Sequence, residues 1–86
     1  MTESEIIQDI KEELLKAEQK HPFWPDDILH QIAIVNEESG EATRAALQFQ
    51  YEEGELDEVK NELIQTAAMC IRMLKNLENV SRIKTN

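Results

Sequence analysis

The chain has 86 residues, of which 31% are charged and 5% are aromatic, and its formal net charge is −9. This length predicts a single domain covering residues 1–86. The negative charge argues against partners that require a basic surface, so we expect the chain to bind neither nucleic acid nor an anionic membrane.

Several further classes of protein are disfavoured by what the sequence lacks. No apolar run approaches the roughly 20 residues of a membrane-spanning helix. Residues 1–10 carry acids where a secretory signal would need basic residues. Cys70 is the lone cysteine, so an internal disulfide is excluded. These features favour a cytoplasmic protein.

The apolar residues recur at helical spacing, no segment alternates like a strand, and glycine and proline number two each, which together predict an all-α fold. A first helix is predicted from about Glu3 to Lys20, because Thr2 and Glu5 have the spacing of a capping box. Its predicted apolar stripe is Ile6, Ile7, Ile10, Leu14 and Ala17. The prolines of the segment 21–25 end this helix, since each disfavours helical backbone in the residue before it.

A second helix is predicted from about Asp27 to Tyr51, where Asp26 or Asp27 can cap its start and Gly54 marks its end. A third helix begins near Glu55. We expect its core stripe to be Leu56, Val59, Leu63, Ala67, Cys70, Leu74 and Leu77. The prediction makes Cys70 an inert core thiol, and residues 81–86 are expected to form a frayed end. The short connection at Gly54 favours antiparallel packing of the second and third helices.

The second helix carries acids inside its own apolar stripe. At about 100° of rotation per residue, these positions fall within roughly 80° of one another: Ile34, Glu38, Glu41, Ala45 and Phe49. An amphipathic helix normally turns its acids to the opposite side. Burying two carboxylates without a cation is costly, and a bound divalent metal is the simplest remedy. Solvated acids, or an ion pair of Glu41 with Arg44, are the alternative.

The third helix can complete such a site. Glu58, Glu62 and Gln65 share one of its sides, and antiparallel packing would bring them towards Glu38 and Glu41. Oxygen ligands of this kind suit Mg²⁺ or Mn²⁺. No Gly-rich phosphate loop, Cys-x-x-Cys pair or His-Glu-x-x-His motif offers a different chemistry.

These residues resemble the signature of the MazG-like all-α nucleoside triphosphate pyrophosphohydrolases, which is Glu-Glu-x-x-Glu on one helix and Glu-x-x-Asp on the next. The first half corresponds to residues 37–41, Glu-Glu-Ser-Gly-Glu, and the second to residues 62–65, Glu-Leu-Ile-Gln. The resemblance covers roughly residues 20 to 77, and residues 21–27 are similar to the lead-in of small phage-type members. Gln65 stands where the family has aspartate, which removes one negative charge.

The resemblance implies hydrolysis of a (deoxy)nucleoside triphosphate to the monophosphate and pyrophosphate. It assigns Glu38, Glu41 and Glu62 as Mg²⁺ ligands, with Gln65 at the fourth position and Glu58 as a partial substitute. It assigns Glu37 the role of orienting or deprotonating the attacking water. It also implies a homodimer or homotetramer built as a four-helix bundle.

Four further residues are candidates for contacts with substrate. Trp24 would stack on a base or cap the core. His30 would touch substrate or metal, or serve the structure alone. Lys60 and Arg72 would meet phosphates or remain solvated. Two other interpretations stay open: a non-catalytic helical module that binds nucleotide or protein, which Gln65 favours, and a plain oligomerisation bundle.

Overall fold

The computed structural model describes residues 1–80 and 82, and all regular structure within these residues is helical. The three helices are α1 (Glu3–Lys20), α2 (Ile28–Tyr51) and α3 (Leu56–Asn76), and one 3-10 turn, η1 (Leu77–Asn79), extends α3. The predictions of an all-α fold and of three helices are therefore confirmed. The predicted frayed end lies outside the described residues, apart from Arg82.

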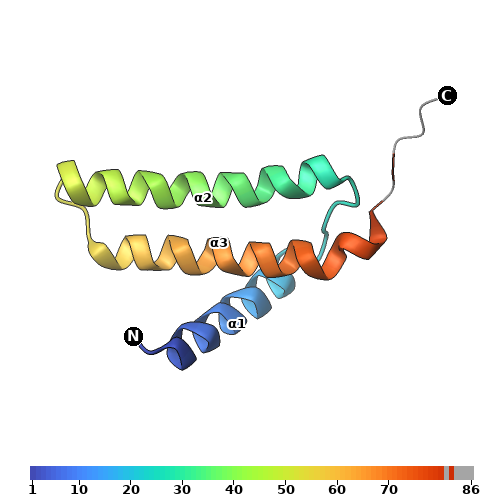
Figure 1. Cartoon of the computed structure of the whole chain (residues 1–86), viewed down its shortest axis with the longest axis horizontal. Coiled ribbons are helices and arrows are strands. Elements are labelled where there is room, and N and C mark those ends of the chain that lie inside the picture. Colours follow the sequence, from blue (N-terminus) through green and yellow to red (C-terminus); the bar gives the residue numbers. More distant parts are fainter. Residues whose placement is uncertain (81, 83–86) are drawn as a thin grey trace.

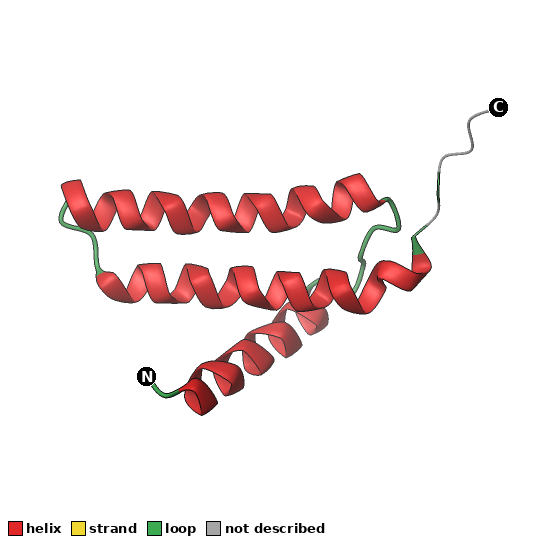
Figure 2. Ribbon diagram, viewed as in Figure 1, coloured by secondary structure: helices red, strands yellow, loops and turns green. Residues whose placement is uncertain are grey.

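The long helices α2 and α3 lie side by side and antiparallel, whereas α1 crosses α3 obliquely (Figure 1). Short loops join the helices, as Figure 2 shows. The arrangement makes α3 the central element, because it packs against both of the others. In the described residues no helix is both long enough and apolar enough to span a membrane.

Local interactions fix where α1 and α2 begin. Thr2 and Glu5 form the predicted capping box, with the Thr2 side chain accepting from the Glu5 amide at 3.1 Å. Asp27 caps α2 by accepting from the amides of Leu29 and His30. Gln31 is fully buried and donates to the Pro25 carbonyl at 3.0 Å, which anchors the loop before α2.

The turn between α2 and α3 depends on Gly54 for space rather than for backbone freedom. Its φ is not positive, and the left-handed position in this turn belongs to Glu53 with φ 60°. A Cβ on Gly54 would lie 2.9 Å from the Gln48 carbonyl carbon, and the Gly54 amide donates to the Gln48 carbonyl oxygen at 2.9 Å. The turn therefore closes tightly and sets α3 against α2.

A small apolar core lies where α1 crosses α3. Leu14, Ala68 and Met69 form its centre. Partly buried side chains packed around it are Ile10, Ala17, Trp24, Ile34, Val35 and Ile71. This core holds α1 to α3, and Ile34 and Val35 of α2 also pack against it.

The predicted core stripe of α3 is wrong for several of its members. Leu56 is 53% exposed, Leu63 57% and Leu74 67%, and Cys70 is also exposed rather than an inert core thiol. The physical reason is that α3 turns a different side, carrying Glu62, Gln65 and Met69, towards α1 and α2. The described residues therefore leave Leu56, Leu63, Cys70 and Leu74 of the predicted stripe exposed.

Candidate metal centre

Three glutamates meet between α2 and α3. Glu38 and Glu41 are three residues apart on α2, so they project from adjacent turns of one side. Glu62 comes from α3, which the antiparallel packing places opposite. One carboxylate oxygen from each lies within 4.8 Å of the other two. We call Glu38, Glu41 and Glu62 the carboxylate cluster.

Two members of the carboxylate cluster carry oxygens that nothing in the described chain satisfies. Oε2 of Glu38 and Oε2 of Glu62 are both removed from solvent and lack a hydrogen-bond partner. A buried carboxylate oxygen without a partner is costly. Glu41 is exposed and closes the cluster on its solvent side.

The electrostatics of the carboxylate cluster are unfavourable for the charged forms. Burial, followed by the charges of Glu41, Glu62, Glu37 and Glu13, raises the pKa of Glu38 above its ordinary value. Burial, the charge of Glu41, a side-chain hydrogen bond with Glu41 and the charge of Glu58 raise the pKa of Glu62 in the same direction. Like charges gathered in a poorly solvated place have this effect when no cation balances them.

No basic side chain neutralises the carboxylate cluster in the described part of the chain. The ion pairs found there are Lys60 with Asp57 and Lys75 with Glu18. The alternative of an ion pair between Arg44 and Glu41 is therefore not observed. Arg44 instead shares with Glu41 the lining of an open pocket of about 320 Å³, completed by Ala45, Gln48, Glu58 and Glu62.

The other predicted metal ligands, Glu58 and Gln65, and the predicted base, Glu37, lie around the carboxylate cluster. Glu58 is exposed and lines the pocket that contains Arg44. Gln65 is half-buried and lines a second pocket together with Glu38. Glu37 is exposed, and its charge acts on Glu38. The predicted set is thus brought together around one point of the α2–α3 contact.

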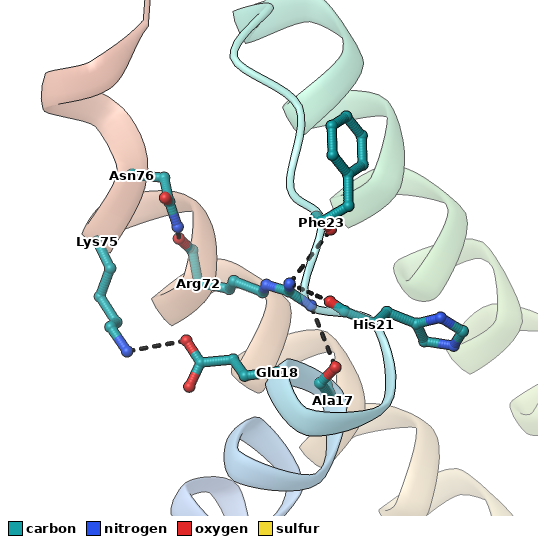
Figure 3. Close-up of polar contacts among 7 residues, drawn as sticks. All are labelled: Ala17, Glu18, His21, Phe23, Arg72, Lys75 and Asn76. Carbon is teal, nitrogen blue, oxygen red and sulfur yellow. Dashed lines mark hydrogen bonds and ion pairs between the residues drawn. The ribbon is translucent and has the colours of Figure 1, made fainter.

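Arg72, predicted to meet phosphates or remain solvated, instead forms hydrogen bonds within the fold. It is 5% exposed, and its guanidinium donates to the carbonyl oxygens of Ala17, His21 and Phe23, as Figure 3 shows. The guanidinium also lies 4.8 Å from the centre of the Trp24 ring. Its donors are therefore directed to main-chain carbonyls at the end of α1 and in the following loop rather than to a phosphate.

The other three candidates for substrate contacts lie away from the carboxylate cluster or in the core. Trp24 packs against the core beside Arg72, so the core-capping alternative describes its environment. Lys60 is exposed and pairs with Asp57 at 3.8 Å. His30 is exposed in the first turn of α2 and lines neither of the two pockets at the carboxylate cluster.

The sequence analysis missed the contribution of α1. The second pocket, of about 390 Å³, brings residues of α1 and of the loop after it against Glu38 and Gln65. These residues are Glu13, Lys16, Ala17, Lys20 and His21. The i, i+4 spacing of Lys16 and Lys20 places them on one side of α1, but only the tertiary contact with α3 turns that side towards Glu38.

Comparison with known protein families, with curated proteins and with solved structures gave no match to this chain. Function is therefore inferred from residues 37–41 and 62–65 and from the geometry of the carboxylate cluster.

Proposed function

We propose that the chain is a Mg²⁺-dependent hydrolase that converts a (deoxy)nucleoside triphosphate to the monophosphate and pyrophosphate. The observation that carries the proposal is the pair of buried, unpartnered oxygens of Glu38 and Glu62, with Glu41 beside them. A divalent cation would supply the partner that these oxygens lack. The resemblance to MazG-like enzymes connects this metal centre with a triphosphate substrate.

The carboxylate cluster fits the donor set of a hard cation. Glu38, Glu41 and Glu62 would hold Mg²⁺, or Mn²⁺ in its place, through carboxylate oxygens. Gln65 and Glu58 lie on either side as further oxygen donors. The bound cation would neutralise phosphate oxygens and polarise the α-phosphorus. The raised pKa values of Glu38 and Glu62 do not prevent binding, since the cation itself would favour their ionised forms.

A residue of the chain itself, Glu37, would deprotonate the attacking water. Glu37 is solvent-exposed and directly precedes Glu38 on α2, so it can take a proton without being a metal ligand. In the proposed reaction water attacks the α-phosphorus and its proton passes to Glu37. The bond from this phosphorus to the α–β bridging oxygen breaks, and pyrophosphate leaves with the bridging oxygen.

We also propose that a second copy of the chain covers the exposed side of α3. Leu56, Leu63 and Cys70 follow one another at intervals of seven residues, and all are exposed. A seven-residue repeat of apolar positions is typical of helices that pack against another helix. A chain of 86 residues with so small a core gains from such association. The dimer or tetramer and the cytoplasmic location stay predictions.

The oligomer is tested by light scattering coupled to gel filtration. The wild-type protein is expected at twice or four times the mass of one chain. Leu63→Glu is expected to give monomers, whereas the matched change Leu15→Glu on α1, also at an exposed leucine, is expected to leave the assembly intact. A wild-type monomer at micromolar concentration would contradict the proposal.

Gln65 supports a second candidate function, a helical module that binds nucleotide without hydrolysing it. Its neutral amide lies beside Glu38 where the resembled family has a carboxylate, which weakens the site for a second cation. Calorimetric binding of a triphosphate in Mg²⁺ without any release of pyrophosphate would favour this candidate over the hydrolase.

The hydrolase is tested by incubating the purified protein with a panel of ribo- and deoxyribonucleoside triphosphates in Mg²⁺ or Mn²⁺. Release of pyrophosphate together with the monophosphate from at least one of them is expected. Release of inorganic phosphate and a diphosphate would show cleavage at the wrong bond. No product with any triphosphate would contradict the proposal.

A further inference from the structure

The pockets on the two sides of the carboxylate cluster differ in charge. The pocket with Arg44 has one basic residue against Glu41, Glu58 and Glu62. The second pocket, which we call the α1 pocket, is lined by Lys16 and Lys20, whose formal charges balance those of Glu13 and Glu38. His21 adds a further hydrogen-bond donor to this pocket. The three carboxylates of the cluster and a divalent cation together carry one negative charge. With that cation bound, the α1 pocket would reach neutrality, while the Arg44 pocket would stay negative.

The two lysines of the α1 pocket are free to bind an anion. In the described residues neither Lys16 nor Lys20 forms an ion pair, in contrast to Lys60 and Lys75. Their i, i+4 spacing places both ammonium groups over the same pocket. In a chain with a net charge of −9, two unpaired lysines facing the carboxylate cluster are a local exception to the acidic surface.

The wall that carries these lysines is held in place by the fold. Arg72 ties the last turn of α1 and the following loop to α3 through the carbonyls of Ala17, His21 and Phe23. Lys75 of α3 also pairs with Glu18 at 2.9 Å. Figure 3 shows the His21 imidazole directed away from Arg72, so the contact with Arg72 uses only the His21 main chain. The basic end of α1 is thus fixed before any ligand arrives.

From the charge of this pocket, its place beside Glu38 and its rigid wall, we propose that Lys16, Lys20 and His21 form the subsite for the terminal phosphates of the substrate. The inference rests on the proposed function and deepens it. The triphosphate would lie with its α-phosphorus at the carboxylate cluster and its β- and γ-phosphates under α1. The pyrophosphate product would then be released from the α1 side.

The subsite is tested with inorganic pyrophosphate, whose binding needs no turnover. Pyrophosphate is titrated by calorimetry in Mg²⁺ into the wild-type protein, Lys16→Gln, Lys20→Gln and Lys11→Gln. Lys11 lies on the same helix but outside the pocket, so it is matched in charge and element. Lys16→Gln and Lys20→Gln are each expected to weaken pyrophosphate binding about 3- to 10-fold. Lys11→Gln is expected to bind like the wild type.

Turnover and metal binding separate this inference from the proposed function. Lys16→Gln and Lys20→Gln are expected to raise the KM for the triphosphate, and Mn²⁺ titration of both is expected to match the wild type. A wild-type enzyme that turns over while all three lysine variants behave alike would overturn the subsite and leave the hydrolase standing. Lysine-dependent binding of pyrophosphate without turnover would overturn the hydrolase and support the anion subsite.

Discussion

Two regions of this small protein remove charged groups from water, and they differ in how those groups are satisfied. At the end of α1, the buried guanidinium of Arg72 donates to three main-chain carbonyls and lies over the Trp24 ring. Between α2 and α3, the buried Oε2 atoms of Glu38 and Glu62 have no hydrogen-bond partner among the described residues.

We interpret the difference as one between a structural charge and a functional one. A buried charged group whose hydrogen bonds are formed stabilises the fold, and its removal leaves the acceptors of those bonds without a donor. Buried charges of one sign without partners oppose the fold, and perturbed pKa values of this kind favour a functional site. We therefore expect substitutions in the two regions to have opposite effects on stability and activity.

The largest expected effect is on turnover. Glu38→Gln and Glu41→Gln are each expected to lower kcat by about 10³-fold or more, because the proposed cation would stabilise the transition state by several kcal/mol. Pyrophosphate release is the measurement, and circular dichroism checks that the helices persist. Glu52→Gln at the exposed end of α2 is the control and is expected to retain full activity. Equal activity of Glu38→Gln and Glu52→Gln would contradict the proposed role of the carboxylate cluster in turnover.

The opposite result is expected at Arg72. Arg72→Met keeps much of the apolar stem but removes the donors to Ala17, His21 and Phe23. It is expected to lower the free energy of unfolding by about 3 kcal/mol, which urea denaturation measures. Lys75→Met removes the neighbouring exposed ion pair and is expected to cost less than about 1 kcal/mol. If the two variants were equally stable, the hydrogen bonds of Arg72 would not be what ties α1 and the following loop to α3.

A smaller effect is expected from pH in the metal-free protein. Since the pKa values of Glu38 and Glu62 are raised in the folded state, the folded chain binds protons more tightly than the unfolded chain. These two groups therefore make stability fall as pH rises from about 4.3, the ordinary glutamate value, through the raised pKa values.

Thermal melts of the wild type and Glu38→Gln in chelator isolate this contribution. Glu38→Gln is expected to melt above the wild type at neutral pH, and the gap is expected to close as the pH falls towards 5. Mg²⁺ is expected to stabilise the wild type more at neutral pH than at pH 5, because protons compete for the same oxygens. A difference in melting temperature between the two proteins that does not change with pH would show that the charge of Glu38 does not destabilise the fold.

The sequence predicts the helices because their signals are local. The Thr2–Glu5 capping box, the Asp27 cap and the tight turn at Gly54 all involve residues within a few positions of one another. The carboxylate cluster follows from the same information. The spacing of Glu38 and Glu41 fixes their common side, and a short turn makes α2 and α3 antiparallel.

The role of Arg72, the approach of α1 to Glu38 and the exposure of the apolar side of α3 could not be predicted, because they depend on contacts between distant residues. Arg72 reaches the end of α1 across 55 positions to Ala17, and no local pattern distinguishes it from a solvated arginine. The approach of Lys16 and Lys20 to Glu38 requires knowing how α1 crosses α3. The periodicity of α3 correctly shows which side is apolar, but it does not show whether this chain or a second copy covers Leu63.

The most direct test of the central claim is the binding of a divalent cation itself. Electron paramagnetic resonance of Mn²⁺ titrated into the protein counts bound ions without substrate or turnover. We predict at least one saturable site in the wild type and in Glu52→Gln, and its loss in Glu38→Gln and Glu62→Gln. Binding that is absent at millimolar Mn²⁺, or that is the same in all four proteins, would contradict the assignment of the carboxylate cluster as a metal centre.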